Sequence, residues 1–198
     1  LSGLWSFSSG CDHATWIAAL VPVWTQGQTA PTGRENLRLM LMPKNEVNFV
    51  DQWHVNGMRG TASFSFELDE VFVPERRTYS AADPVRSNSP VYSISRTLLC
   101  AMGFATVAVG VARASLSAVI DLTRNKTPVR TTTELHDLPT THRLIGEAEA
   151  LWRSAGAYLR ETSAAVWESA SKNGVVPTEE RIQARLATTY AIQRSAEA

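Results

Sequence analysis

Cysteine is scarce in this 198-residue sequence, which contains only Cys11 and Cys100. Two cysteines so far apart cannot form the dense disulfide framework of small secreted domains, so we expect two buried thiols in a cytoplasmic protein. The sequence also lacks a CxxC pair, and its four histidines do not form an HExxH pattern. These absences argue against a metal ion bound by protein ligands.

Net charge and long hydrophobic runs are missing as well. Nineteen basic side chains balance nineteen acidic ones, so no overall field draws the chain toward nucleic acid or anionic lipid. The sequence contains no signal-peptide pattern. It also contains no uncharged run of about 18 residues or more that would suggest a membrane span. A serine hydrolase is not indicated, because Ser8-Ser9-Gly10 lacks the first glycine of GxSxG.

Composition changes near residue 93, where a part rich in tryptophan and proline gives way to one rich in alanine, leucine, arginine and glutamate. We therefore predict an α+β fold in two domains: an antiparallel β-barrel-like domain over 1–93, then an incomplete antiparallel helical bundle over 94–198. The first residues already have the composition of a domain interior, and the last are still helical in pattern. We therefore expect the chain to be part of a longer protein.

A short apolar run ended by Pro22 predicts a strand at 16–21, and alternation of apolar and polar residues predicts two more at 36–42 and 61–68. In the last of these, Phe64 and Phe66 should face the core, whereas Ser63 and Ser65 should lie on the polar face. Turn-forming residues between the first two strands are Gly27, Pro31 and Gly33. The GxxG sequence at 57–60 matches a loop of one class of RNA-binding domain, but its extended flanks favour a turn between strands.

Three helices are predicted in the second domain. The segment 94–122 is almost uniformly apolar, so we expect it to be buried over most of its circumference. A second helix should run over 140–172 and end at Asn173-Gly174. The third should begin with Thr178 as its N-cap, and its apolar stripe comprises Ile182, Leu186 and Tyr190.

Three segments in this order carry a family resemblance: WSFSSGCDHATW at 5–16, WHVNGMRGTAS at 53–63 and VFVPER at 71–76, with a long Ala/Gly-rich helix after them. The pattern resembles the acyl-CoA dehydrogenase superfamily, and most of all its flavin-dependent monooxygenase branch, over most of the chain. The resemblance implies the oxygenase component of a two-component enzyme. Such a component takes reduced flavin (FADH2 or FMNH2) from a separate reductase and hydroxylates an aromatic or polycyclic substrate with O2, as a homotetramer.

The resemblance places the first segment beside the flavin ring. Ser9 then hydrogen-bonds flavin N5 and the C4a adduct, Phe7 forms an aromatic wall, and the backbone of Ser8 is a further contact. A hydroxyl suits this position because it can both donate and accept a hydrogen bond. The structural alternative is that both serines satisfy a bulged edge strand.

Four further residues are candidates from the same resemblance. His13 lies where the branch often has Asp-His, and is either catalytic or bonded structurally to backbone. Arg59 and Ser63 could meet flavin phosphate or substrate, although a solvated turn arginine is an equal alternative. Arg124 matches an arginine that reaches the flavin of a neighbouring subunit in dehydrogenases, but the Phe-Gly that usually follows it is replaced by Asn-Lys-Thr-Pro.

Two alternatives to an oxygenase stay open. An acyl-CoA dehydrogenase-type flavoenzyme is disfavoured by residues 8–13, where dehydrogenases usually have a Trp-Ile-Thr-Asn type segment. The other alternative is a non-catalytic part whose helices serve only for oligomerisation. In the family, an amino-terminal helical domain and a last bundle helix complete the active site, and both would lie outside residues 1–198.

Overall fold

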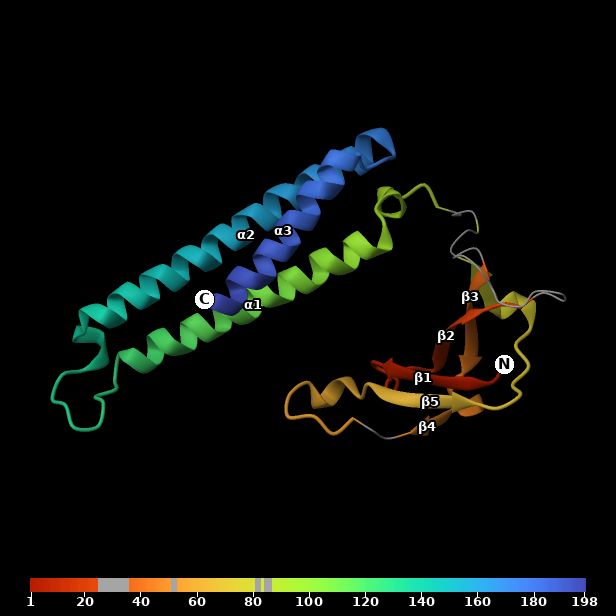
Figure 1. Ribbon diagram of the computed structural model, residues 1–198, viewed down its shortest axis with the longest axis horizontal. Coiled ribbons are helices and arrows are strands. Elements are labelled where there is room, and N and C mark those ends of the chain that lie inside the picture. The colour runs from red at the N-terminus through yellow and green to blue at the C-terminus, as the bar shows by residue number, and fades with distance from the viewer. Residues whose placement is uncertain (25–35, 51–52, 81–82, 84–86) are drawn as a thin grey trace. The chain divides into compact units, whose positions relative to one another are not determined.

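A computed structural model describes residues 1–24, 36–50, 53–80, 83 and 87–198 of the chain (Figure 1). The chain divides into two compact units, residues 1–84 and 85–198. The first unit contains the strands and the second contains the long helices. The predicted α+β class is therefore confirmed. The turns predicted at Gly27, Pro31 and Gly33 lie outside the described residues.

Within the described residues, six strands form two antiparallel sheets of three strands each, in the orders β1-β5-β4 and β2-β3-β6. The strands are β1 (Gly3–Ser8), β2 (Trp16–Pro22), β3 (Leu37–Pro43), β4 (Asn48–Val50), β5 (Phe64–Leu68) and β6 (Thr78–Ser80). No ladder joins the two sheets in the part of the chain that the structure describes. The predicted barrel-like closure is thus not found: the strands are short, and the chain passes from one sheet to the other between β1 and β2.

The core of the first unit is formed by side chains from both sheets. The strand predicted from the apolar run at 16–21 is confirmed as β2, in which Ile17, Ala19 and Val21 are buried while the residues between them are exposed. Met42 of β3 and Phe66 of β5 belong to the same hydrophobic cluster, so the two sheets share one core.

The strand predicted at 61–68 is shorter than expected. A 3₁₀ turn occupies Arg59–Thr61, and Met58 and Ala62 on either side have φ values of 55° and 43°. The polar-face prediction is wrong for Ser63 and Ser65, which are both buried. Ser65 Oγ donates to Ser6 Oγ of β1 at 3.3 Å, so burial of this hydroxyl is compensated by a hydrogen bond. The GxxG sequence forms a turn between β4 and β5, as predicted.

Three α-helices form most of the described part of the second unit: α1 (Arg96–Thr123), α2 (Pro139–Asn173) and α3 (Thr178–Glu197). Each packs against the other two. Gly174 follows the last residue of α2 and caps the helix, and its φ of 66° is the left-handed conformation that glycine adopts without strain. The predicted N-cap of α3 is wrong, because Pro177 occupies that position and Thr178 is the first helical residue.

The buried faces of α1 and α3 differ from the predicted ones. In α1 the buried residues are Leu98, Ala105, Ala112, Leu116 and Thr123, so burial is confined to one face. The predicted stripe of α3 is exposed at Ile182 and Leu186, whereas Ala184, Ala187 and Ala191 are buried. Cys100 on α1 is exposed, contrary to prediction, whereas Cys11 is buried.

Small side chains explain this arrangement, because they let helix backbones approach closely, and the larger apolar residues of α1 and α3 are left on the outside. By length and composition α1 would also suit a membrane span, with a mean hydropathy of 1.6, but core helices of soluble proteins pass the same test.

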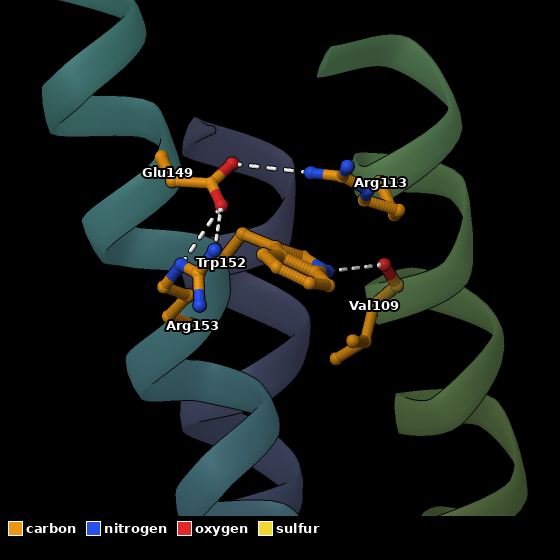
Figure 2. A network of polar contacts seen from close by, with 5 residues as sticks. All are labelled: Val109, Arg113, Glu149, Trp152 and Arg153. Atoms are coloured by element: carbon orange, nitrogen blue, oxygen red, sulfur yellow. Dashed lines mark hydrogen bonds and ion pairs between the residues drawn. The ribbon is translucent and has the colours of Figure 1, made fainter. Parts of the chain in front are cut away.

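A polar network joins α1 to α2 (Figure 2). Trp152 Nε1 donates to the carbonyl oxygen of Val109 at 3.0 Å. Glu149 accepts from Arg113 at 3.2 Å and from Arg153 Nε at 2.8 Å. Both guanidinium groups lie near the Trp152 ring, at 4.9 Å and 5.7 Å from its centroid. The network fixes which turns of the two helices face each other.

Candidate functional site

The site predicted around Ser9 begins with an irregularity in β1. The register of β1 against β5 shifts between Trp5 and Ser8, which is the bulge expected on an edge strand. Phe7 within it has a φ of 61°, an uncommon value for an aromatic residue. The amide of Ser9 then donates to the Phe7 carbonyl at 2.8 Å. The backbone therefore turns sharply at the predicted site.

Ser9 and Ser63, far apart in sequence, meet at this turn. Their Oγ atoms lie 2.8 Å apart, and Ser63 Oγ lies 3.0 Å from Thr61 Oγ1. Ser63 is 7% exposed, whereas Ser9 is exposed. The structure thus brings together two of the predicted site residues, of which Ser63 is buried and Ser9 is exposed.

Two hydrogen bonds hold the Ser9 turn against the Thr61–Ser63 turn. The Gly10 amide donates to the Thr61 carbonyl at 2.7 Å, and Cys11 Sγ donates to the Ala62 carbonyl at 3.0 Å. Cys11 is only 2% exposed, so its thiol donates this hydrogen bond within the core. The two turns are consequently fixed relative to each other.

Phe7, in the turn before Ser9, contacts a second aromatic side chain, that of Trp53. The Phe7 ring is 75% exposed and meets the Trp53 ring edge to face, with the centroids 6.2 Å apart. Trp53 is oriented in turn by its Nε1, which donates to the Met58 carbonyl at 3.1 Å. Gly10, with a φ of 81°, has no atom within 4 Å of where a Cβ would lie, so its surroundings are open. The hydroxyl-bearing exposed residue Ser9, the exposed Phe7 ring and the open backbone at Gly10 can contact a flat polar ring system such as a flavin.

The other predicted residues are more dispersed. Ser8 is half-buried and accepts, through its carbonyl, from the Cys11 amide at 3.1 Å. His13 and Arg59 are exposed side chains of the first unit. The His13 amide donates to the Gly10 carbonyl at 3.0 Å, so its backbone belongs to the Ser9 turn. The roles assigned to these three residues remain predictions.

Arg124 belongs to the second unit, directly after α1. It is exposed, and its Nη1 pairs with Asp121 Oδ1 at 3.1 Å, one helical turn before it. An exposed pair of this kind contributes little stability, so the guanidinium is available to a ligand at small cost. Its contact with a flavin stays a prediction.

Thr61, Trp53 and Cys11 form part of the site but were not predicted as site residues. All three lie within the segments that carry the family resemblance. Their contribution depends on the turns at Met58 and Ala62, because those turns fold Thr61 back beside Ser63. Nothing in the alternation pattern indicated a break in the strand there.

Two pockets are lined by other residues. One, of about 440 Å³, lies between α1 and α2, with Arg113, His136, His142 and Glu149 among its lining residues. The second, of about 570 Å³, is mainly apolar and runs beside β2, with Trp24, Met40 and Phe72 among its lining residues. Among the described side chains, no three His, Cys, Asp or Glu residues gather closely enough to hold a metal ion.

Comparison with known proteins finds one family and several relatives of the chain. The family described as acyl-CoA dehydrogenase, C-terminal domain, matches residues 102–198. The FADH(2)-dependent resorcinol hydroxylase oxygenase component of Rhizobium sp. strain MTP-10005 is 31% identical over 132 residues, which are 61% of this chain and 31% of that protein.

Two solved structures share the fold. 3-HSA hydroxylase from Rhodococcus sp. RHA1 superposes with a TM-score of 0.83 and 27% identity, covering 99% of this chain and 51% of that one. XiaF from Streptomyces sp., in complex with FADH2 and glycerol, gives a TM-score of 0.85 and 23% identity, covering 100% of this chain and 51% of that one. The chain thus spans about half the length of these structures.

The chain belongs to the acyl-CoA dehydrogenase superfamily, because its helical unit matches that family and follows a unit of strands. Within it, the chain is similar to oxygenase components of flavin-dependent monooxygenases, and it aligns with about half of their length, the middle β domain and the C-terminal helices.

Proposed function

We propose that the protein is the oxygenase component of a two-component monooxygenase that hydroxylates an aromatic or polycyclic substrate with reduced flavin (FADH2 or FMNH2) and O2. The observation that carries the proposal is the Ser9–Ser63 hydroxyl pair at 2.8 Å, in which Ser9 is exposed and lies two residues after Phe7, whose ring contacts that of Trp53. When bound, reduced flavin supplies the two electrons with which one oxygen atom enters the substrate and the other leaves as water.

The residues of the site have distinct proposed roles. Ser9 holds a proton of the flavin at its Oγ, and Ser63 supports that hydroxyl from inside. Phe7 covers one side of the ring and helps to exclude water, while the Ser8 backbone is a further contact. His13 is proposed as a second catalytic residue because its backbone belongs to the same turn as Ser9. Arg59 provides positive charge for flavin phosphate or substrate. Arg124 is proposed, from the family resemblance, to reach the flavin of a neighbouring subunit.

Relatives support the chemistry proposed for the site. The resorcinol hydroxylase is named as FADH(2)-dependent and as an oxygenase component. An oxygenase component implies a separate flavin reductase as partner, and we propose one for this protein. We also propose a cytoplasmic location and a homotetramer, for which the exposed apolar face of α1 offers contact surface.

Transfer of labelled oxygen tests the proposal directly. The full natural chain is given chemically reduced flavin, isotopically labelled O2 and a panel of phenols and indoles. A hydroxylated product carrying one labelled oxygen is expected. Consumption of reduced flavin with formation of hydrogen peroxide alone, for every aromatic offered, would contradict the proposal.

A second candidate is an acyl-CoA dehydrogenase, since the family matched over residues 102–198 carries that description. It predicts bleaching of oxidised flavin by an acyl-CoA thioester in the absence of O2. The hydroxylase predicts no such bleaching. A protein that binds neither form of flavin would support the third possibility, a non-catalytic role in oligomerisation.

A further inference from the structure

Three hydroxyl groups in the first unit form a row that ends on a backbone carbonyl. Thr61 Oγ1 donates to the carbonyl oxygen of Met58 at 2.9 Å. Ser63 Oγ lies 3.0 Å from Thr61 Oγ1, and Ser9 Oγ lies 2.8 Å from Ser63 Oγ. Each hydroxyl carries a single proton, so each can donate only one such bond.

The carbonyl at the end of the row sets the direction of every bond in it. The carbonyl oxygen of Met58 can only accept a hydrogen bond, so the hydroxyl proton of Thr61 lies in the bond to that oxygen. Ser63 must then donate to Thr61, and Ser9 must donate to Ser63. We propose that Thr61 and Ser63 are positioning residues that fix Ser9 as a hydrogen-bond acceptor on its exposed side.

The surroundings keep the row in this direction. Ser63 is 7% exposed, so water competes little for its hydroxyl. The Thr61 and Ala62 carbonyls are held by the Gly10 amide and the Cys11 thiol, at 2.7 Å and 3.0 Å. These bonds fix the backbone that carries Thr61 and Ser63 against the turn that carries Ser9.

A fixed acceptor discriminates between the two redox forms of a flavin. This consequence depends on the proposed function, in which Ser9 lies beside flavin N5. Reduced flavin has an N–H at N5 and can donate to Ser9, whereas oxidised flavin has a bare nitrogen there that can only accept. The row therefore favours binding of the reduced form, which an oxygenase component receives from its reductase.

The test is the ratio of two dissociation constants, those of oxidised and reduced flavin, measured anaerobically on the full natural chain. In wild type this ratio should favour the reduced form. Thr61→Val frees the proton of Ser63, and with it that of Ser9, so the preference should fall by about fivefold, as expected for one hydrogen bond. Ser63→Ala should shift the ratio in the same direction, and Thr61→Ser should retain the wild-type ratio.

Thr78→Val is the matched control. Thr78 Oγ1 also donates to a carbonyl three residues before it, that of Glu75, at 3.0 Å, next to another 3₁₀ turn. The ratio of the two dissociation constants in Thr78→Val should equal that of wild type. An unchanged ratio in folded Thr61→Val and Ser63→Ala proteins overturns the inference alone. Failure of wild type to bind either form overturns the proposed function and the inference with it.

Discussion

The Ser9 hydroxyl is hydrogen-bonded to that of Ser63, and Ser9 is an exposed residue. Ser9→Ala should therefore weaken binding of reduced flavin about fivefold, because one hydrogen bond is lost. Hydroxylated product should fall relative to hydrogen peroxide. Equilibrium titration and product analysis measure these two effects.

Ser8→Ala provides the control for that change at the adjacent residue. The observed bond of Ser8 in this region is made by its carbonyl, which accepts from the Cys11 amide. The alanine variant keeps that carbonyl and should bind reduced flavin as wild type does. Equal losses in both variants would show that the turn as a whole, and not the Ser9 hydroxyl, determines binding.

The sequence contained part of this site. The resemblance singled out Ser9 and Ser63, and the structure brings their hydroxyls together. Thr61 was assigned to a regular strand because polar and apolar residues alternate from there onward. The left-handed residues Met58 and Ala62 break that strand, and neither residue type announces such a conformation. The hydroxyl row therefore required coordinates.

At the scale of single elements, the Trp152 side chain links α2 to α1. Trp152→Phe removes the Nε1 donor to the Val109 carbonyl but keeps an aromatic ring. The free energy of unfolding should fall by about 1 kcal/mol, the usual contribution of such a bond. Urea denaturation followed by far-UV circular dichroism measures it.

Trp167→Phe on the same helix is the comparison for that substitution. Trp167 is 50% exposed, and its replacement should change the free energy of unfolding by less than about 0.5 kcal/mol. Similar values for both variants would mean that the indole bond of Trp152 contributes nothing measurable to helix packing.

Helix spacing is the second determinant at this scale. Ala105 on α1 is completely buried, so Ala105→Leu forces extra volume into a close helix contact. We expect a loss of about 1–3 kcal/mol in the free energy of unfolding. Ala114→Leu, at an exposed position of the same helix, should change it by less than about 0.5 kcal/mol. Equal stability of the two variants in urea would contradict close packing at Ala105.

Helix positions were predictable from the sequence to within two residues at most ends, but the buried faces were not. A period of 3.6 residues reveals a stripe without saying which stripe meets a neighbour. In α3 the large residues Ile182 and Leu186 suggested one face, whereas the small residues Ala187 and Ala191 form the actual contact. Which of the two faces of α3 is buried depends on the helices that pack against it.

At the scale of the whole molecule, α1 has a second apolar face that the described residues leave uncovered. Phe104, Val107 and Val111 are 70%, 64% and 60% exposed and recur at helical spacing. With about 100° per residue, this face lies roughly 100° from the buried one around Ala105 and Ala112. Apolar surface of this kind usually marks an interface.

The proposed homotetramer provides a cover for this second face of α1, and charge placed there should prevent assembly. We expect wild type to sediment as a tetramer and the Phe104→Lys, Val111→Lys double variant as a smaller species, because a buried unpaired charge is costly. Thr106→Lys adds a charge to α1 about 200° around the helix from Phe104, and should leave the mass unchanged. Analytical ultracentrifugation at several protein concentrations measures all three. A double variant that keeps the tetramer mass would show that subunits meet elsewhere, and a monomeric wild type would exclude the homotetramer itself.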